Sequence, residues 1–129
     1  GTVEKEYEAK SQKIEGISST TWNAVNVGMQ GVVQNSSVFP EINASGISVS
    51  GKTGTAQQSN ERADHGLFVA FAPSESPEIA MALRIANGYS STYASEVGSA
   101  ILQYYYQITD SSELITGQAA EIAATTHGD

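Results

Sequence analysis

The chain has 129 residues, the length of one domain at most, and its 40% hydrophobic and 16% charged content is that of a globular protein. Six Lys and Arg face 14 Asp and Glu, and the net charge of −8 argues against a nucleic-acid backbone or an anionic membrane surface as the main partner. Because the chain has no cysteine, a disulfide framework, a thiol nucleophile and a thiolate metal site are excluded.

The start of the chain carries no targeting signal. No stretch approaches the ~18 consecutive apolar residues of a membrane span, and the signal-peptide pattern is absent. The first residue is Gly1 and not Met, so we interpret the chain as a piece of a longer protein. Residues 1–16 mix charges of both signs with few apolar side chains and are predicted to form a solvated arm.

A helix is predicted over about 19–34. Ile17 and Ser18 have the spacing of a hydrophobic staple and an N-cap, and apolar residues recur at helical spacing at Trp22, Val25, Met29, Val32 and Val33. Gly28 and Gly31 inside this helix cost up to ~1 kcal/mol each relative to Ala. Close backbone packing is the simplest reason for them, and flexibility beside a site is the alternative.

Three strands follow a loop at 35–46. Residues 47–57 begin with alternating apolar and polar side chains, 67–72 are apolar throughout and stop at Pro73, and 78–86 alternate again. Short polar joins connect these strands, as in an antiparallel meander.

A second helix is predicted over about 91–107, and residues 109–129 form a polar tail. The order helix, three strands, helix predicts an α+β fold in which helices pack on an antiparallel sheet of at least three strands. The domain then spans 17–108, between the arm 1–16 and the tail 109–129.

The most informative motif is centred on Lys52. Residues 46–53 satisfy the phosphate-loop pattern G-x-x-x-x-G-K-[ST], which requires a bare loop that opens into a helix. Here the middle residues alternate like a strand, the following residues have no helical apolar face, and neither later strand ends in an Asp for magnesium. Nucleotide binding is therefore disfavoured.

The same residues resemble a different signature. Residues 50–57 (Ser-Gly-Lys-Thr-Gly-Thr-Ala-Gln) resemble the third motif of the penicillin-binding proteins, the serine D,D-transpeptidases that cross-link peptidoglycan. Val-Gly-Met-Gln-Gly-Val-Val at 27–33 and the strand sequences within 65–80 are similar to their class B members, and the resemblance extends from about 17 to 106. It implies the C-terminal part of the penicillin-binding, serine β-lactamase-like fold.

The four central residues suit the chemistry of that family. Lys52 supplies a positive field, Thr53 and Thr55 supply hydroxyl donors, and Gly54 lets a substrate backbone approach. The resemblance implies that Lys52 lies against the catalytic serine network, that both threonines bind the substrate or β-lactam carboxylate, and that the Thr55 N–H is an oxyanion-hole donor. Strand alternation puts Lys52 and Thr53 on opposite sides, so both reach one ligand only at an exposed, twisted edge. An ordinary solvated edge strand is the alternative.

Two further motifs of the family are missing. The residues three positions before the four lysines are Thr2, Tyr7, Lys10 and Val49, so no Ser-x-x-Lys is present, and no Ser is followed two positions later by Asn. The nucleophile and its base would therefore come from an upstream part, and the chain alone is expected to be inactive.

The resemblance also implies partners and a location. The longer protein would cross-link cell-wall stem peptides, be inhibited by β-lactams, use neither metal nor cofactor, and act on the extracytoplasmic face of the bacterial membrane to which it is anchored. This chain itself is expected to be soluble and not to contact the membrane. A serine β-lactamase fragment and a non-catalytic interaction module of the same fold are the alternatives.

The last strand, 78–86, is expected to have an open edge. In the resembling family this strand pairs with an N-terminal strand that the chain does not obviously supply, which favours self-association through 78–86. Residues 1–16 would partly cover that edge in the alternative arrangement. His65 and His127 lack partners at ligand spacing and are interpreted as structural or tail histidines.

Overall fold

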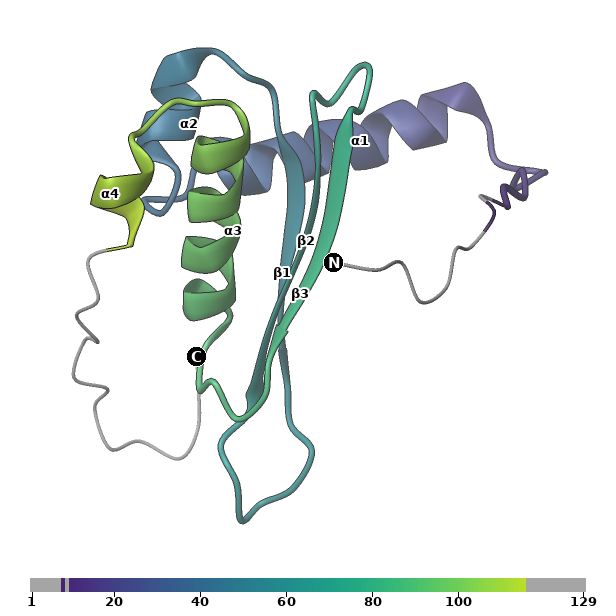
Figure 1. Cartoon of the computed structure of the whole chain (residues 1–129). Coiled ribbons are helices and arrows are strands. Elements are labelled where there is room, and N and C mark those ends of the chain that lie inside the picture. Colours follow the sequence, from purple (N-terminus) through teal and green to yellow (C-terminus); the bar gives the residue numbers. More distant parts are fainter. Residues whose placement is uncertain (1–7, 9, 116–129) are drawn as a thin grey trace.

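A three-stranded antiparallel sheet in the order β1-β2-β3 forms the centre of the computed structural model, which describes residue 8 and residues 10–115 (Figure 1). Its strands are β1 (Ser50–Ala56), β2 (His65–Ala72) and β3 (Ile79–Ile85). The predicted meander and the α+β class are confirmed. Because consecutive strands pair, β2 is the middle strand, and β1 and β3 are the borders.

Two long helices pack against this sheet. Helix α1 (Ser19–Gln34) packs against β1, and α3 (Ser91–Tyr105) lies over β2 and also contacts both borders. Both helices coincide closely with the predicted ones. Figure 1 shows α3 running along one face of the sheet, while α1 crosses it at an angle.

Two short helices were not predicted. Helix α2 (Pro40–Ser45) lies in the expected loop 35–46: its first residue is a proline, and Gly46 ends it with a φ of 78°. Helix α4 (Ser111–Leu114) lies in the stretch predicted as a tail. Neither is long enough to show a 3.6-residue apolar period. Residues 1–7 of the predicted arm, residue 9 and residues 116–129 of the tail lie outside the described residues.

Helix α1 begins as predicted but is covered less than its sequence suggests. The Ser18 hydroxyl accepts a hydrogen bond from the Thr21 N–H at 3.1 Å, which confirms the N-cap. Trp22 is 45% exposed among the described residues, and Val33 is the buried residue of this helix. A Cβ added at Gly28 would meet nothing within 4 Å. Close packing is therefore the wrong explanation for Gly28 in the described part of the chain.

The core is built around Phe68 of β2. Its ring is fully buried and lies 5.5 Å from the ring of Phe39, measured between centroids. Gly98 of α3 and Gly51 of β1 leave the space for this ring, since a Cβ on Gly98 would lie 2.6 Å from two of its carbons. The other buried apolar residues are Val33, Ile42, Val49, Ala70, Ala72, Ala94 and Leu102.

A polar network fixes the entry of β1. The buried Ser50 hydroxyl bonds to the side chain of Asn26 on α1 and lies 2.8 Å from the Ser74 hydroxyl. Asn26 also donates to the Ser74 carbonyl at 3.2 Å, and the Ser48 hydroxyl donates to the Glu75 carboxylate at 2.6 Å. The turn between β2 and β3 is thereby tied to α1 and to the start of β1.

The pKa of the Glu75 carboxyl is lowered, and the hydrogen bond from the Ser48 hydroxyl is the largest cause. The backbone N–H of Glu75 and the side-chain amide of Gln30 lower this pKa further. A carboxyl pKa that is lower in the folded state stabilises the fold above the usual glutamate range, and this contribution is lost as the pH falls through the folded value. We therefore expect Ser48→Ala to raise the Glu75 pKa toward its usual value in an NMR titration of side-chain carboxyls. Gln30→Ala, which removes a smaller cause, is the control and should raise it less; an unchanged pKa in Ser48→Ala would contradict this account.

We expect Gly98→Ala to destabilise the chain by about 1–3 kcal/mol, because the added methyl group overlaps the buried Phe68 ring and the packed core cannot yield. Gly28→Ala is the matched helical control and should be neutral or gain up to ~1 kcal/mol, because its surroundings are open. Urea unfolding of both variants measures the difference. Equal effects would show that Phe68 does not limit the approach of α3.

Candidate active-site strand

The Lys-Thr-Gly-Thr sequence occupies the middle of β1, a border strand of the sheet. The strand continues through Ala56, so no helix starts behind Lys52. A phosphate-binding loop would need that helix. The nucleotide-binding alternative is therefore wrong for this chain.

The strand divides the four residues between two faces. Lys52 lies opposite Val69, which in turn lies opposite Ala82, and all three are exposed. Thr53 lies opposite Phe68, on the face that α3 covers. Because side chains alternate along a strand, Gly54 lies on the same face as Lys52, called the open face here, and Thr55 lies on the face that α3 covers, called the helix face.

The backbone groups of the threonines face the free edge of β1. The Lys52 ammonium is exposed and donates to the Thr53 carbonyl at 2.7 Å. In an antiparallel strand the N–H and C=O of one residue point to the same side, and this side alternates from residue to residue. Thr55, two positions on, therefore directs its N–H and C=O to the same free edge, beside the ammonium of Lys52.

Thr53 also borders a hollow between the two long helices. This cavity of about 310 Å³ lies between the end of α1, the residues after it and the start of α3. No charged side chain lines it. Its hydroxyl lining comes from Ser36, Thr53, Ser91, Thr92 and Ser95.

The two glycines of β1 differ in what the fold requires. A Cβ on Gly51 would lie 2.9 and 3.0 Å from the Phe68 ring and 3.0 Å from Val33, tighter than ordinary contacts. A Cβ on Gly54 would lie 3.5 Å from Leu67, an ordinary van der Waals contact. Among the described residues, packing explains glycine at position 51 but not at position 54.

His65, the first residue of β2, links the segment after β1 to the connection between β3 and α3 through hydrogen bonds. Its Nδ1 accepts from the Asn87 N–H at 2.9 Å, and its Nε2 lies 2.8 Å from the Gln58 side-chain oxygen and 2.9 Å from an Arg84 nitrogen. Because Nδ1 is an acceptor, a neutral ring carries its hydrogen on Nε2 and donates it to Gln58. The ring is 7% exposed, and these bonds support the structural interpretation of this histidine. The local sequence gives no sign of these partners, which come from the β1–β2 connection, from β3 and from the connection between β3 and α3.

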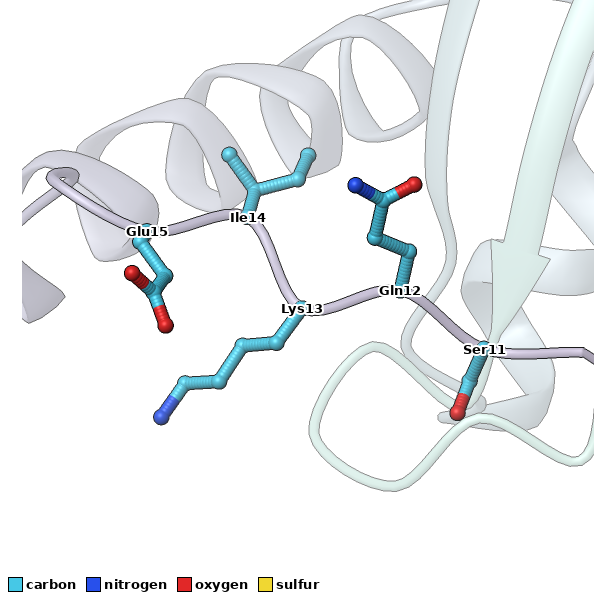
Figure 2. Close-up of a pocket in the computed structure, with 5 residues that line it drawn as sticks. All are labelled: Ser11, Gln12, Lys13, Ile14 and Glu15. Carbon is cyan, nitrogen blue, oxygen red and sulfur yellow. The ribbon is translucent and has the colours of Figure 1, made fainter.

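Two other hollows lie away from β1. One, of about 850 Å³, is lined by residues 11–15, all of them exposed. Figure 2 shows that their five side chains point in different directions from one stretch of chain. No second described element lines the space. Another, of about 400 Å³, lies between α3 and α4 and is lined by apolar side chains such as Val97, Ile101 and Leu114. In the described ranges no cluster of three or more His, Asp or Glu could hold a metal, and no helix is long and apolar enough to cross a membrane.

Comparison with known proteins agrees with this arrangement. The family model of the penicillin-binding protein transpeptidase domain matches residues 2–105. The chain belongs to this family. The peptidoglycan D,D-transpeptidase MrdA of Acinetobacter baumannii is 39% identical over a match that covers 44% of this chain and 11% of that protein.

Solved structures of the family share the fold. The D,D-transpeptidase domain of a peptidoglycan glycosyltransferase from Eggerthella lenta is 29% identical with a TM-score of 0.60, and the match covers 80% of this chain and 24% of that one. Penicillin-binding protein A of M. tuberculosis, solved as an imipenem acyl-enzyme complex, is 26% identical with a TM-score of 0.58. The match covers 70% of this chain and 20% of that one. PBP2 of Pseudomonas aeruginosa in complex with WCK 5153 is 35% identical with a TM-score of 0.56, and the match covers 67% of this chain and 19% of that one. The chain thus spans a quarter or less of the length of these relatives.

We expect Gly51→Ala to lower the stability of the chain by about 1–3 kcal/mol, because the methyl group must displace the Phe68 ring or Val33. Gly54→Ala should change it by less than about 1 kcal/mol, since its Cβ finds ordinary space on the open face. Thermal and urea unfolding of the two variants test this. A larger loss for Gly54→Ala than for Gly51→Ala would overturn the assignment of their faces.

Proposed function

We propose that this chain is part of a peptidoglycan D,D-transpeptidase domain and that β1 is the wall of its cleft that holds the substrate carboxylate and the oxyanion. One observation carries the proposal: Lys-Thr-Gly-Thr lies on a border strand, with an exposed ammonium and a free backbone edge side by side. Family membership and the fold of the solved relatives support it.

Each residue has one task in this proposal. Lys52 supplies positive charge toward the catalytic serine and the substrate carboxylate from one face of β1, and the hydroxyls of Thr53 and Thr55 donate hydrogen bonds to that carboxylate from the other face. The carboxylate is therefore held at the free edge of β1, where both faces are within reach. The Thr55 N–H, which faces the free edge, stabilises the oxyanion that forms as the carbonyl is attacked. Gly54 leaves room for the substrate backbone, which accounts for a glycine that the packing of β1 does not require.

The nucleophile comes from outside these 129 residues. No Ser-x-x-Lys or Ser-x-Asn occurs in the chain, and Ser50, the serine nearest the motif, is buried in the network with Asn26 and Ser74. In the proposed reaction a serine of the upstream part attacks the penultimate carbonyl of the stem peptide and expels the terminal D-Ala. An amine of a second stem peptide then takes the acyl group from the serine. Without that serine, this chain alone does not form an adduct.

The partners and the location belong to the same proposal. Stem peptides are the substrates and β-lactams the inhibitors, and the imipenem acyl-enzyme of the M. tuberculosis relative supports the second of these. The longer protein is anchored in the bacterial membrane and works on its extracytoplasmic face. It uses neither a metal nor a cofactor.

Labelling with a fluorescent penicillin tests the proposal. We expect no covalent adduct with this chain and a stable adduct with the longer protein that joins it to the upstream motifs. Rapid hydrolysis of the penicillin by the longer protein would favour a β-lactamase. A folded longer protein that forms no adduct would favour a non-catalytic module.

Variants of Thr55 in the longer protein separate its backbone from its side chain. Thr55→Pro removes an N–H that points away from β2, so the ladder is kept while acylation should slow by about 10²–10³-fold. Thr55→Val keeps this N–H and loses the hydroxyl, so the acylation rate at saturating penicillin should fall less. Stopped-flow acylation kinetics measure both, and equal losses would contradict an oxyanion role for the N–H.

A further inference from the structure

We propose that His65 is a positioning residue for the oxyanion donor, because its backbone and its ring fix the end of β1 at which the Thr55 N–H faces the free edge. The inference rests on the proposed role of that N–H and adds the residues that hold it in place. In this proposal His65 does not touch the substrate. It acts through the backbone of β1 and through the connection between β3 and α3.

The backbone of His65 binds β1 at the residue that follows Thr55. Because the backbone groups of Thr55 face the free edge, those of the next residue, Ala56, face β2. Ala56 lies opposite His65, so these two residues exchange backbone hydrogen bonds. The register of the described strands ends with this pair. His65 therefore closes the ladder directly behind the proposed oxyanion donor.

The ring of His65 extends this hold beyond the ladder. Its Nε2 lies 2.8 Å from the side-chain oxygen of Gln58, two residues after the end of β1, and 2.9 Å from a nitrogen of Arg84 on β3. Its Nδ1 accepts from the Asn87 N–H in the connection between β3 and α3. The ring is buried, where a hydrogen bond is stronger than in water. One side chain thus holds both connections at this end of the sheet.

The connection that the ring holds has a strained backbone. Asn87 and Tyr89 have φ angles of 53° and 66°, in the left-handed region that bulky residues rarely adopt. Two hydrogen bonds keep them there, since the Asn87 N–H donates to the His65 ring and the Tyr89 N–H donates to the Asp64 carbonyl at 3.0 Å. Strained conformations persist only where the surroundings impose them, and they concentrate at functional sites.

This connection places the start of α3 against the pair that contains Thr55. Thr55 lies opposite Gly66, and a Cβ on Gly66 would lie 2.4 Å from the Ser90 carbonyl oxygen. That atom belongs to backbone, so only glycine permits the approach. Figure 1 shows the β1–β2 connection and the β3–α3 connection at the same end of the sheet. The Thr55–Gly66 pair therefore lies between the ladder end that His65 closes and the helix start that its ring positions.

An oxyanion donor depends on support of this kind. The negative charge that it stabilises develops only as the carbonyl is attacked, so the donor must already point at the right place. A displacement of about 1 Å can cost ~10²-fold in rate. Because β1 is a border strand, β2 holds it from one side only. The bonds of His65 limit the movement that this leaves to the end of β1.

Variants of Gln58 in the longer protein test the proposal without altering a buried group. Gln58 is exposed, so Gln58→Ala should leave the fold intact. We expect its acylation rate at saturating penicillin to fall about 3- to 10-fold, and the apparent dissociation constant for penicillin to change less than about 2-fold, because the donor acts in the transition state. Gln58→Glu keeps an acceptor oxygen for Nε2 and should retain most of the rate. Asn60→Ala is the matched control and should acylate at the unaltered rate, since this exposed side chain in the same connection bonds to no described residue.

Double variants show whether Gln58 acts through the oxyanion donor. Thr55→Pro removes the donor, so adding Gln58→Ala to it should slow acylation by less than about 1.5-fold further. His65→Asn keeps an acceptor near the place of Nδ1 but loses the reach of Nε2, so Gln58→Ala should add little to this variant as well. Circular dichroism confirms that the variants compared are folded.

Three results would overturn the proposal. The first is an unaltered acylation rate in Gln58→Ala. The second is an equal loss in Asn60→Ala, which would assign the effect to the connection as a whole. The third is a loss in Gln58→Ala that multiplies fully with that of Thr55→Pro, because this would show that Gln58 acts elsewhere. Failure of the proposed function looks different: Thr55→Pro alone would then acylate at the unaltered rate, or the longer protein would form no adduct, and the inference would fall with it.

Discussion

The ring of Phe68 sets how closely α3 approaches the sheet, and the positions of the other elements follow from that contact. The ring fills the space that Gly98 on the helix and Gly51 on β1 leave free, and Phe39 from the segment after α1 closes it from another side. A side chain at either glycine would push the helix or the border strand outward. The position of β1, and with it the Lys-Thr-Gly-Thr sequence that directly follows Gly51, is therefore a consequence of core packing.

A three-stranded meander has two borders, and this chain uses them differently. The edge of β1 is partly shielded at its start by the network of Ser50, Asn26 and Ser74, and beyond that point it presents the Lys52 ammonium and the backbone of Thr53 and Thr55. The edge of β3 presents small alanines between two opposite charges. The first border has the polarity for a charged small ligand, and the second has a regular backbone edge.

The relation to longer relatives gives both borders a physical meaning. The chain matches a quarter or less of each solved family member, and several of its apolar side chains, among them Trp22, Val25 and Val97, are substantially exposed in the described part. Exposed apolar surface of this kind is usual where a domain continues beyond the piece considered. In the proposed mechanism the cleft needs residues from two parts of the longer protein: the binding groups lie on β1, and the nucleophile lies in the upstream part. The cleft is complete only when both parts are present.

The sequence by itself determined the two long helices, the three strands and their meander, because apolar periodicity and short joins are local signals that this fold does not override. It also determined the residues of the candidate site, since Lys52 to Thr55 lie next to one another in the chain and their alternation follows from the strand alone. Tertiary structure decided what local pattern cannot express: that α1 leaves most of its apolar face exposed, that His65 bonds to two connections and to β3, and that Gly51, not Gly54, is required by the core. These features depend on atoms distant in sequence. The short helices show no periodicity: α4 begins at the Asp110 N-cap, and α2 is bounded by Pro40 and by Gly46.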